Sequence, residues 1–598
     1  MHPMLLSAAL ALLAAPANAQ RHPADILMVR SPDSSIGNWG ALPAMLGLSA
    51  RIESREDSTL PEGDLSRYKL VILSTNMDVY EDERRRLWEY ANRGGILVTW
   101  FADDTRAHRS FWPYKLVLSD KDPPKATFAD TDHPLLKGLR GKTFQGRLVG
   151  GDVVKSWNHR RWQVLAQTDH GAALLVARYG EGAIVDWQFH APFSSRQDVL
   201  EVFAENLMTW AGVARVDPEE LKQRSLREVL AAVARRQMRP LQSGEWTRGE
   251  WEHVQASKPA AGIAWSYPRG VTLYGMLRAG KVLGDEAFSD FVLRQNDIVA
   301  KQHAWLSWQR ETFGKHTTPS LIPQLMRLGC LDDCGSMASQ VVEGLLNHGA
   351  EATPEMLAML RSIADYITNK QSRFPDGSLC RGRTLWIDDL YMSVPFLARW
   401  GVYTEDSSYL DDAARQIINF ASRMQDDDGL WFHGWFNREG KPSPYKWGRG
   451  NGWSLLSQVE LLSHLPDDHP ERERLLGILR KHIAGLMRVQ AESGMWRQVL
   501  DEPDLWEETS CTGMFAYSIA RAVRRGWIEP ENLPAARRAV EALKTRVSWD
   551  GSVLGTCAGT GISRSLDAYR NRPRPVNDGH GPGPVLLAGT ELLVARRK

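Results

Sequence analysis

The last two-thirds of the chain repeat one hydrophobic pattern six times. A short cluster of aromatic, glycine and polar residues is followed each time by an almost wholly apolar helical stretch and then by a break. Apolar residues on all sides are typical of a helix that is buried on every side. The six apolar stretches are residues 273–283, 337–346, 390–400, 454–465, 514–523 and 585–594.

Charged, amphipathic stretches lie between these apolar helices, for example residues 353–370, 409–423 and 471–488. Helical hairpins repeated at a spacing of about 60 residues are longer than the units of solenoid proteins. Closing six such hairpins into a ring buries each inner helix against two neighbours. The pattern therefore predicts an all-α (α/α)6 barrel over residues 216–598.

All six polar clusters precede their inner helices, so a closed ring would bring them together at one rim. The clusters are residues 265–270, 331–335, 386–389, 447–453, 506–510 and 577–581. They contain tryptophan, histidine, arginine and carboxylate side chains. Indole faces stack on sugar rings, and charged groups bind hydroxyls and carboxylates, so the rim is predicted to bind carbohydrate.

Residues 20–215 follow another pattern, in which β-rich runs alternate with helical ones. The expected strands are residues 26–29, 70–73, 96–100, 173–177 and 183–187, and the expected helices are residues 82–92 and 198–210. This alternation predicts an α/β sheet domain. Residues 179–182, Tyr-Gly-Glu-Gly, lie between two expected strands and are predicted to form a hairpin turn. A domain boundary is expected at residues 213–218, where Asp217-Pro218 starts a charged helix.

Length and composition narrow the function. A chain of 598 residues is longer than a single hydrophobic core normally supports, so more than one domain is expected. Its 73 basic and 72 acidic residues nearly cancel, so the net charge gives no general attraction to nucleic acid or to a membrane surface. Residues 1–19 combine an apolar core, too short to span a membrane, with Ala17-Asn-Ala19, which predicts a signal peptide cleaved after Ala19 and a periplasmic or secreted protein. Five cysteines without a CxxC pair indicate neither a disulfide framework nor a zinc site.

The N-terminal domain loosely resembles the ThuA-like and class I glutamine amidotransferase-like proteins, which have flavodoxin-like folds. An amidotransferase needs a cysteine nucleophile, and residues 1–329 contain no cysteine and no Gly-x-Ser-x-Gly elbow. The domain is therefore predicted to be non-catalytic. Sugar binding, assembly and simple support all remain open as its task.

Four ordered motifs in the helical part resemble those of glycoside hydrolase family 105. They are Trp386-Ile-Asp-Asp-Leu-Tyr-Met392, His433-Gly-Trp435, Trp447-Gly-Arg-Gly-Asn-Gly-Trp453 and Glu508-Thr-Ser510. The family comprises unsaturated rhamnogalacturonyl hydrolases and is related to the unsaturated glucuronyl hydrolases of family 88. The resemblance, which spans roughly residues 225–598, implies removal of a 4,5-unsaturated uronic acid from the non-reducing end of pectin oligosaccharides produced by lyases.

The resemblance also implies the reaction. An aspartate protonates C4 of the vinyl ether, water adds at C5, and the resulting hemiketal opens and expels the remaining saccharide. Such chemistry needs a general acid that also organises or deprotonates water. Neither a metal nor another cofactor is implied.

The motif match makes Asp388 the proton donor, with Asp389 as its rival. A second, assisting aspartate maps to residues 331–335, where Asp333 fits the Asp-x-Gly pattern best and Asp332 is expected to be a cap or a hydrogen-bond partner. For both acidic pairs the alternative is a purely structural role at a helix N-cap.

Binding residues are expected around these carboxylates. Arg449, which lies between two glycines, offers a bidentate fork for the uronate carboxylate, and His433 offers a second donor. The stacking candidates are Trp386, Trp447 and Trp453, and the other polar candidates are Asn451, Glu508 and His580.

Other functions remain open at this point. The same barrel would serve an unsaturated glucuronyl hydrolase, an inverting glycosidase with two carboxylates, or a lyase with a tyrosine or histidine base. It would also serve a periplasmic saccharide-binding protein without activity. A direct glycosidase cleaves intact saccharides, whereas the preferred reaction requires the double bond. The aglycone sugar and the oligomeric state are left open by the sequence.

Overall fold

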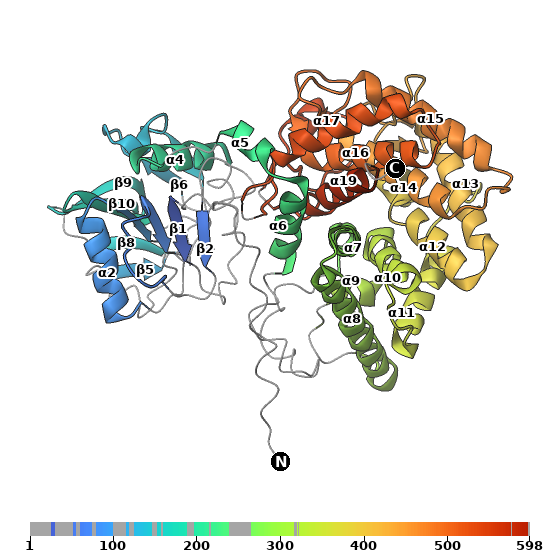
Figure 1. Ribbon diagram of the computed structural model, residues 1–598, viewed down its shortest axis with the longest axis horizontal. Helices are drawn as coiled ribbons and strands as arrows, with labels where there is room; N and C mark the ends of the chain where they lie inside the picture. The colour runs from blue at the N-terminus through green and yellow to red at the C-terminus, as the bar shows by residue number, and fades with distance from the viewer. Residues whose placement is uncertain are drawn as a thin grey trace, which may run out of the picture.

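The computed structural model describes residues 25–29, 52–55, 60–73, 79–99, 115–118, 125–145, 152–156, 160–187, 197–213, 217–238, 265–315, 320, 322–549, 551–575 and 577–595. Figure 1 shows an α/β part on the left and a helical part on the right. The expected signal peptide, residues 1–19, lies outside the described residues.

The N-terminal part is built on one mixed sheet with the strand order β2-β1-β3-β4-β11-β10-β9-β6-β7, in which β8 also pairs with β10 and β5 pairs with β8. The strands are β1 Ile26–Val29, β2 Ile52–Arg55, β3 Leu70–Leu73, β4 Ile96–Thr99, β5 Lys115–Leu118, β6 Lys125–Phe128, β7 Thr143–Gln145, β8 Asp152–Ser156, β9 Trp162–Thr168, β10 Gly171–Tyr179 and β11 Gly182–Trp187. The five strands from β2 to β11 in this order run parallel, and the remaining pairs are antiparallel.

Each face of this sheet is covered by a helix. Alternate residues of β1 and β3 pack on opposite sides: Ile26 shares a core with Phe203 of α4 (Gln197–Trp210), and Leu27 shares another with Leu87 of α2 (Glu81–Asn92). Strands covered on both faces read as continuous apolar runs, which is why these segments were recognisable in the sequence. The predicted turn at residues 179–182 is confirmed, because Tyr179 pairs with Gly182 across the β10–β11 hairpin.

A short helix leads from the sheet to the helical part. Asp217 caps α5 (Pro218–Gln223) by accepting a hydrogen bond from the Glu219 N–H at 2.9 Å, which confirms the predicted helix start. Arg224, just after α5, then donates to the Lys544 carbonyl at 2.8 Å and to the Ser548 carbonyl at 3.2 Å. These bonds attach the connection to the helical part.

Six inner helices form a closed ring, so the predicted (α/α)6 barrel is confirmed. Each contacts the next along the chain, and the last contacts the first. The inner helices are α7 Tyr267–Leu283, α10 Gly335–Asn347, α12 Val394–Thr404, α14 Gly448–His464, α16 Thr509–Arg524 and α19 Pro582–Ala595. The outer helices are α6 Leu226–Met238, α8 Glu286–Phe313, α11 Pro354–Asp365, α13 Ser407–Met424, α15 Arg472–Arg488 and α17 Leu533–Lys544. In Figure 1 the inner helices surround the barrel centre.

Short elements complete the fold. They are η1 Pro134–Leu136, α9 Pro323–Arg327, η5 Leu331–Asp333, η6 Tyr366–Lys370, β12 Thr384–Trp386, η7 Ile387–Leu390, β13 Gly434–Phe436, β14 Lys441–Pro442, β15 Trp496–Arg497, β16 Glu507–Glu508, η8 Pro530–Asn532 and α18 Leu566–Arg570. Within the described part of the chain, no helix combines the length and apolarity that crossing a membrane would need.

The inner helices are less apolar than their sequence pattern suggests, because each contributes one charged side chain to a buried cluster, here called the charge ring. Its signs alternate around the barrel, from helix to helix: Arg278, Glu343, Arg399, Glu460, Arg521 and Glu591. Arg399 binds Glu343 at 2.7 Å and Glu460 at 2.5 Å. Arg521 binds Glu460 at 2.8 Å and Glu591 at 3.2 Å, and Arg278 binds Glu591 at 2.6 Å.

The charge ring lies on the barrel axis. Tyr274 of α7 donates to Glu460 of α14 at 3.3 Å, and these two helices stand opposite each other in the ring of six. Buried charges are tolerated when they are paired and hydrogen-bonded, and alternation pairs each glutamate with at least one arginine from a neighbouring helix.

The charge ring predicts acid sensitivity of the fold. Burial alone would raise the pKa of Glu591, but Arg521, Arg278 and Arg524 together lower it to about 2. A folded-state pKa below the ordinary value of 4.5 means that the stabilisation is complete above that pH and is lost as the pH falls from 4.5 towards 2. Chemical denaturation at a series of pH values should show this loss. Glu591→Gln should flatten that pH dependence, and curves that stay parallel in this window would contradict the assignment.

Candidate active site

Two acidic turns lie side by side at the start of inner helices. Asp332 belongs to η5 and Asp388 to η7, and a Cβ on Gly335 would lie 1.6 Å from the Met392 carbonyl oxygen, so only glycine allows this approach. The N-caps of α10 and α12 are Cys334 and Ser393, without side-chain capping bonds. The interpretation of the aspartates as helix caps is therefore wrong.

Asp388 faces His433. Its Oδ2 lies 3.5 Å from His433 Nε2, and both of these buried atoms lack a hydrogen-bond partner among the described residues. Backbone pairing holds the two side chains close together. Strand β12 pairs with β13, so that Trp386 lies opposite Gly434, and the Ile387 N–H donates to the His433 carbonyl at 3.1 Å. The two motifs are thereby held together, with two polar atoms left for a bound molecule.

The electrostatic surroundings keep Asp388 ionised in the free protein. Burial alone would raise its pKa, but the close approach of His433 and the positive charges of Arg381 and Arg449 outweigh burial and lower the pKa. A carboxylate in this environment stays largely deprotonated until a further negative charge comes close to it.

Arg381 clamps the neighbouring carboxylates. It donates to Asp332 at 2.9 and 3.1 Å and to Asp389 at 2.7 and 3.0 Å, and its guanidinium lies 4.7 Å from the Trp386 ring centre. Burial raises the pKa of Asp389 to about 6 against the pull of Arg381, and burial likewise raises the pKa of Asp332. Asp388 and Asp389 thus point to different partners.

Replacing the clamp is expected to disturb the site. Arg381→Lys supplies a point charge in place of a planar fork that serves two carboxylates, so we expect about a tenfold fall in kcat/KM. Arg383→Lys, two positions away and exposed, is the matched control and should change little. Equal effects in the two variants would remove Arg381 from the site.

Asp333 is placed differently from Asp332. It is fully buried, and its carboxylate accepts from Arg327 Nε at 2.9 Å and from the Gly329 N–H at 2.8 Å, within its own segment. Asp332 is partly exposed and interacts electrostatically with Asp388. The structure therefore brings Asp332, rather than Asp333, to Asp388.

Arg449 is buried and directed at the backbone. It donates to the Ala558 carbonyl at 2.9 Å and to that of Cys557, lies 3.9 Å from Glu508, and has its guanidinium 4.7 Å from the Trp447 ring centre. Its Nε finds no partner among the described residues. The expected open fork for a carboxylate is thus mostly occupied, and Arg449 acts on Asp388 through its charge.

The three candidate tryptophans differ in exposure. Trp386 is partly exposed beside Arg381, whereas Trp447 and Trp453 are 1% and 0% exposed. Trp447 packs under His433 with ring centres 4.4 Å apart, and Trp453 packs on Tyr391 at 4.9 Å. Among the three, Trp386 alone presents ring surface to a ligand.

Two polar candidates hold the backbone in place. Asn451 accepts from the Trp431 N–H at 2.8 Å and donates to the Trp431 carbonyl at 2.7 Å. Glu508 caps α16 by accepting from the Cys511 N–H at 2.6 Å, and it also accepts from the Cys557 N–H at 2.9 Å. Both side chains are buried, and their polar atoms are engaged in these hydrogen bonds.

His580 is tied to a tyrosine of the first polar cluster. Its Nδ1 contacts Asp578, and its Nε2 lies 2.7 Å from the hydroxyl of Tyr267. Burial and the charge of Arg449 lower the pKa of His580. Tyr267 is partly exposed and interacts electrostatically with Asp332 and Asp388. Sequence reasoning placed Tyr267 at the rim but gave it no role, and it missed Arg381 and Tyr569, which carry no motif.

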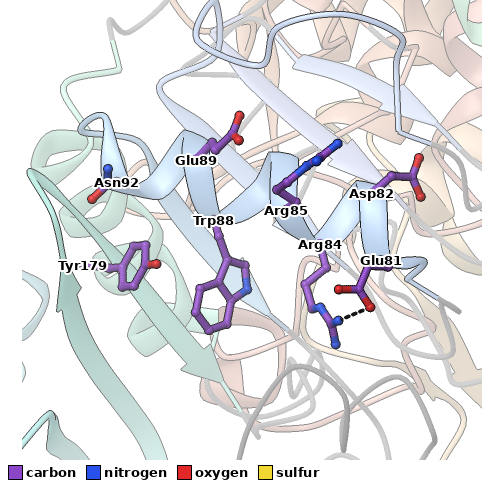
Figure 2. Close-up of a pocket in the computed structure, with 8 residues that line it drawn as sticks. All are labelled: Glu81, Asp82, Arg84, Arg85, Trp88, Glu89, Asn92 and Tyr179. Carbon is purple, nitrogen blue, oxygen red and sulfur yellow. Dashed lines mark hydrogen bonds and ion pairs between the residues drawn. The ribbon is translucent and has the colours of Figure 1, made fainter.

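A hollow of about 720 Å³ lies on the other domain, over the outer face of α2 (Figure 2). Its walls are Glu81, Asp82, Arg84, Arg85, Trp88, Glu89, Asn92 and Tyr179. Charges of both signs spread along one helix, and Arg84 is paired with Glu81 at 2.7 Å. Because these groups do not converge on one point, the barrel rim is the stronger candidate for the functional site.

An (α/α)6 barrel with paired carboxylates, a histidine and a partly exposed indole at one rim is the arrangement expected of a carbohydrate-active enzyme. The chain belongs to Glycosyl Hydrolase Family 88, whose sequence profile matches residues 243–595.

Curated relatives and solved structures match mainly the barrel. The unsaturated rhamnogalacturonyl hydrolase YesR of Bacillus subtilis is 25% identical over 347 residues, which cover 56% of this chain and 92% of YesR. An unsaturated 3S-rhamnoglycuronyl hydrolase of Alteromonas sp. is 29% identical over 222 residues, which cover 36% of this chain and 52% of that protein. The crystal structure of a possible GH105 family member from Salmonella enterica is 24% identical, covers 63% of this chain and 95% of its own, and has a TM-score of 0.49.

Proposed function

We propose that this protein is an unsaturated rhamnogalacturonyl hydrolase that removes a 4,5-unsaturated uronic acid from the non-reducing end of lyase-generated pectin oligosaccharides. The observation that carries the proposal is the buried pair Asp388 and His433, whose facing polar atoms have no partner among the described residues. The family supports hydrolysis of glycosides, and the names of YesR and of the Alteromonas relative support an unsaturated substrate.

In this proposal, substrate binding prepares the acid. The carboxylate of the uronate brings a second negative charge to Asp388, which raises the pKa that His433 and the arginines had lowered. Protonated Asp388 then delivers its proton to C4, and the regained carboxylate accepts a proton from the water that adds at C5. The bond between C5 and the ring oxygen breaks, C5 becomes a ketone, and the hemiacetal at C1 releases the saccharide.

The neighbouring residues take supporting roles. We assign the second carboxylate to Asp332, which Arg381 holds near Asp388, and the stacking surface to Trp386. Tyr267, which is partly exposed at the same rim, is assigned to a substrate hydroxyl, and His580 orients the Tyr267 hydroxyl through its Nε2. Asp333 keeps a structural task through Arg327.

We also infer that the N-terminal domain is flavodoxin-like and non-catalytic. The parallel strands β2, β1, β3, β4 and β11 follow the order 2-1-3-4-5 of such folds, which supports the inference. Residues 1–19 are proposed to be a signal peptide cleaved after Ala19, which makes the mature enzyme periplasmic or secreted.

The function is tested by mixing the full-length protein with unsaturated rhamnogalacturonan disaccharide and following the ultraviolet absorbance of the conjugated uronate. Disappearance of this absorbance is expected, whereas a saturated disaccharide, followed by its release of reducing sugar, should remain intact. Loss only with an unsaturated glucuronyl disaccharide would assign the enzyme to that substrate. Cleavage of the saturated compound would establish a direct glycosidase, and no reaction with any of the three would leave a binding protein.

A further inference from the structure

Tyr569 touches His433 from the side opposite Asp388. It belongs to α18, in the segment between α17 and α19, and it is fully buried against Trp447, Val499 and Leu505. Its hydroxyl lies 2.7 Å from His433 Nδ1 and 3.1 Å from the Ser563 backbone nitrogen. No sequence motif singled this residue out.

These two contacts decide the direction of the bond to His433. The Ser563 N–H can only donate, so the Tyr569 oxygen accepts there. The hydroxyl proton then has one acceptor among the described residues, which is His433 Nδ1. If Nδ1 carried a proton instead, the buried hydroxyl would be left without an acceptor, which costs free energy.

We propose that Tyr569 is a positioning residue that holds His433 as the Nε2–H tautomer and so keeps an N–H donor aimed at the Asp388 carboxylate. The tautomer of a histidine is set by the hydrogen bond that its other nitrogen makes. Nε2 and Oδ2 are 3.5 Å apart in the free protein, and such contacts commonly tighten in the substrate complex.

The consequence for the reaction rests on the proposed function. When Asp388 gives up its proton, the Nε2–H stabilises the carboxylate that forms. The groups that face this pair are the hydroxyl of Tyr569, the indole of Trp447 and the charges of Arg381 and Arg449. None of them replaces the Tyr569 donor, because the arginine charges act on Asp388 and the indole ring packs on the imidazole.

The kinetic test is Tyr569→Phe, which keeps the ring and removes the hydroxyl. Without it the neutral imidazole can carry its proton on Nδ1 and turn a lone pair towards Asp388, so kcat should fall about 10- to 100-fold while KM stays within about twofold. Tyr445→Phe is the matched control, since its ring packs edge-on to Tyr569 at 5.5 Å, and should retain wild-type kcat. An unchanged kcat in Tyr569→Phe, or an equal loss in the control, would overturn the proposal.

The second test needs no substrate. In ¹⁵N-histidine-labelled full-length protein, with His433→Gln for assignment, the wild-type spectrum should show Nε2 protonated and Nδ1 unprotonated near neutral pH. Tyr569→Phe should mix the two tautomers. A wild-type Nδ1–H or imidazolium signal would overturn the proposal even if the variant does not fold. Absence of turnover together with the expected spectrum would reject the proposed function alone.

Discussion

Asp388→Asn is expected to abolish turnover and leave the fold intact. An amide cannot donate the carboxylic proton to C4 or accept one from water, and general acid–base catalysis contributes typically 10²- to 10⁴-fold, so kcat/KM should fall by about 10³-fold. Asparagine has the same shape and keeps the contact with His433, so thermal stability should change little. The ultraviolet assay and a melting curve measure the two quantities.

Variants of the neighbouring aspartates are the controls for that result. Asp389→Asn keeps an oxygen for Arg381 and should retain at least about a tenth of the activity, because Asp389 binds Arg381, whereas Asp388 is the carboxylate beside His433. Asp332→Asn should lose about 10²-fold and Asp333→Asn less, because the latter carboxylate binds Arg327. A loss in Asp389→Asn as large as in Asp388→Asn would transfer the acid to Asp389. A larger loss in Asp333→Asn than in Asp332→Asn would return the second role to Asp333.

Breaking the charge ring is expected to have the largest effect on stability. Glu460 is fully buried and binds Arg399 and Arg521, so Glu460→Gln leaves two buried guanidiniums short of one negative charge. Removing one partner of a buried pair costs about 3–5 kcal/mol. Differential scanning calorimetry should show a lower transition temperature for the barrel.

An exposed ion pair provides the comparison. Lys301 and Asp297 lie 2.8 Å apart on the surface of α8, and Asp297→Asn should cost less than about 1 kcal/mol. The charge ring lies in the middle or second half of the inner helices, whereas the acidic turns lie at their starts, so Glu460→Gln should keep kcat at temperatures where it is folded. A stability loss for Glu460→Gln no greater than that for Asp297→Asn would show that the ring charges are not energetically coupled.

Local periodicity was sufficient for most elements. An inner helix such as α16 is apolar on all sides within one segment, and a strand such as β3 is four consecutive apolar residues, so each could be recognised from its own residues. The charge ring could not be recognised in this way. Arg278 and Glu591 are 313 positions apart, and a single charge in an apolar stretch gives no indication of its partner.

The residues of the candidate site likewise divide into those that the sequence located and those that only the structure revealed. Motifs located Asp388 and His433, and the β12–β13 pairing then brought them together. Arg381 and Tyr569 were missed because they act through partners in other segments, with no pattern around them. Arg449 was located, but its expected fork is largely taken up by backbone carbonyls more than a hundred residues away.

The sequence by itself determined the order of helices, the closure into a barrel and the rim at which the polar clusters meet, because these follow from hydrophobic periodicity within each segment and from where each cluster stands relative to its helix. Only the tertiary structure decided which carboxylate faces the site. Successive residues of a 3₁₀ turn point about 120° apart, so Asp388 reaches His433 while Asp389 reaches Arg381. Which of two neighbouring carboxylates faces the site is set by the partners that approach from distant segments. The positions of those partners depend on the packing of the whole barrel.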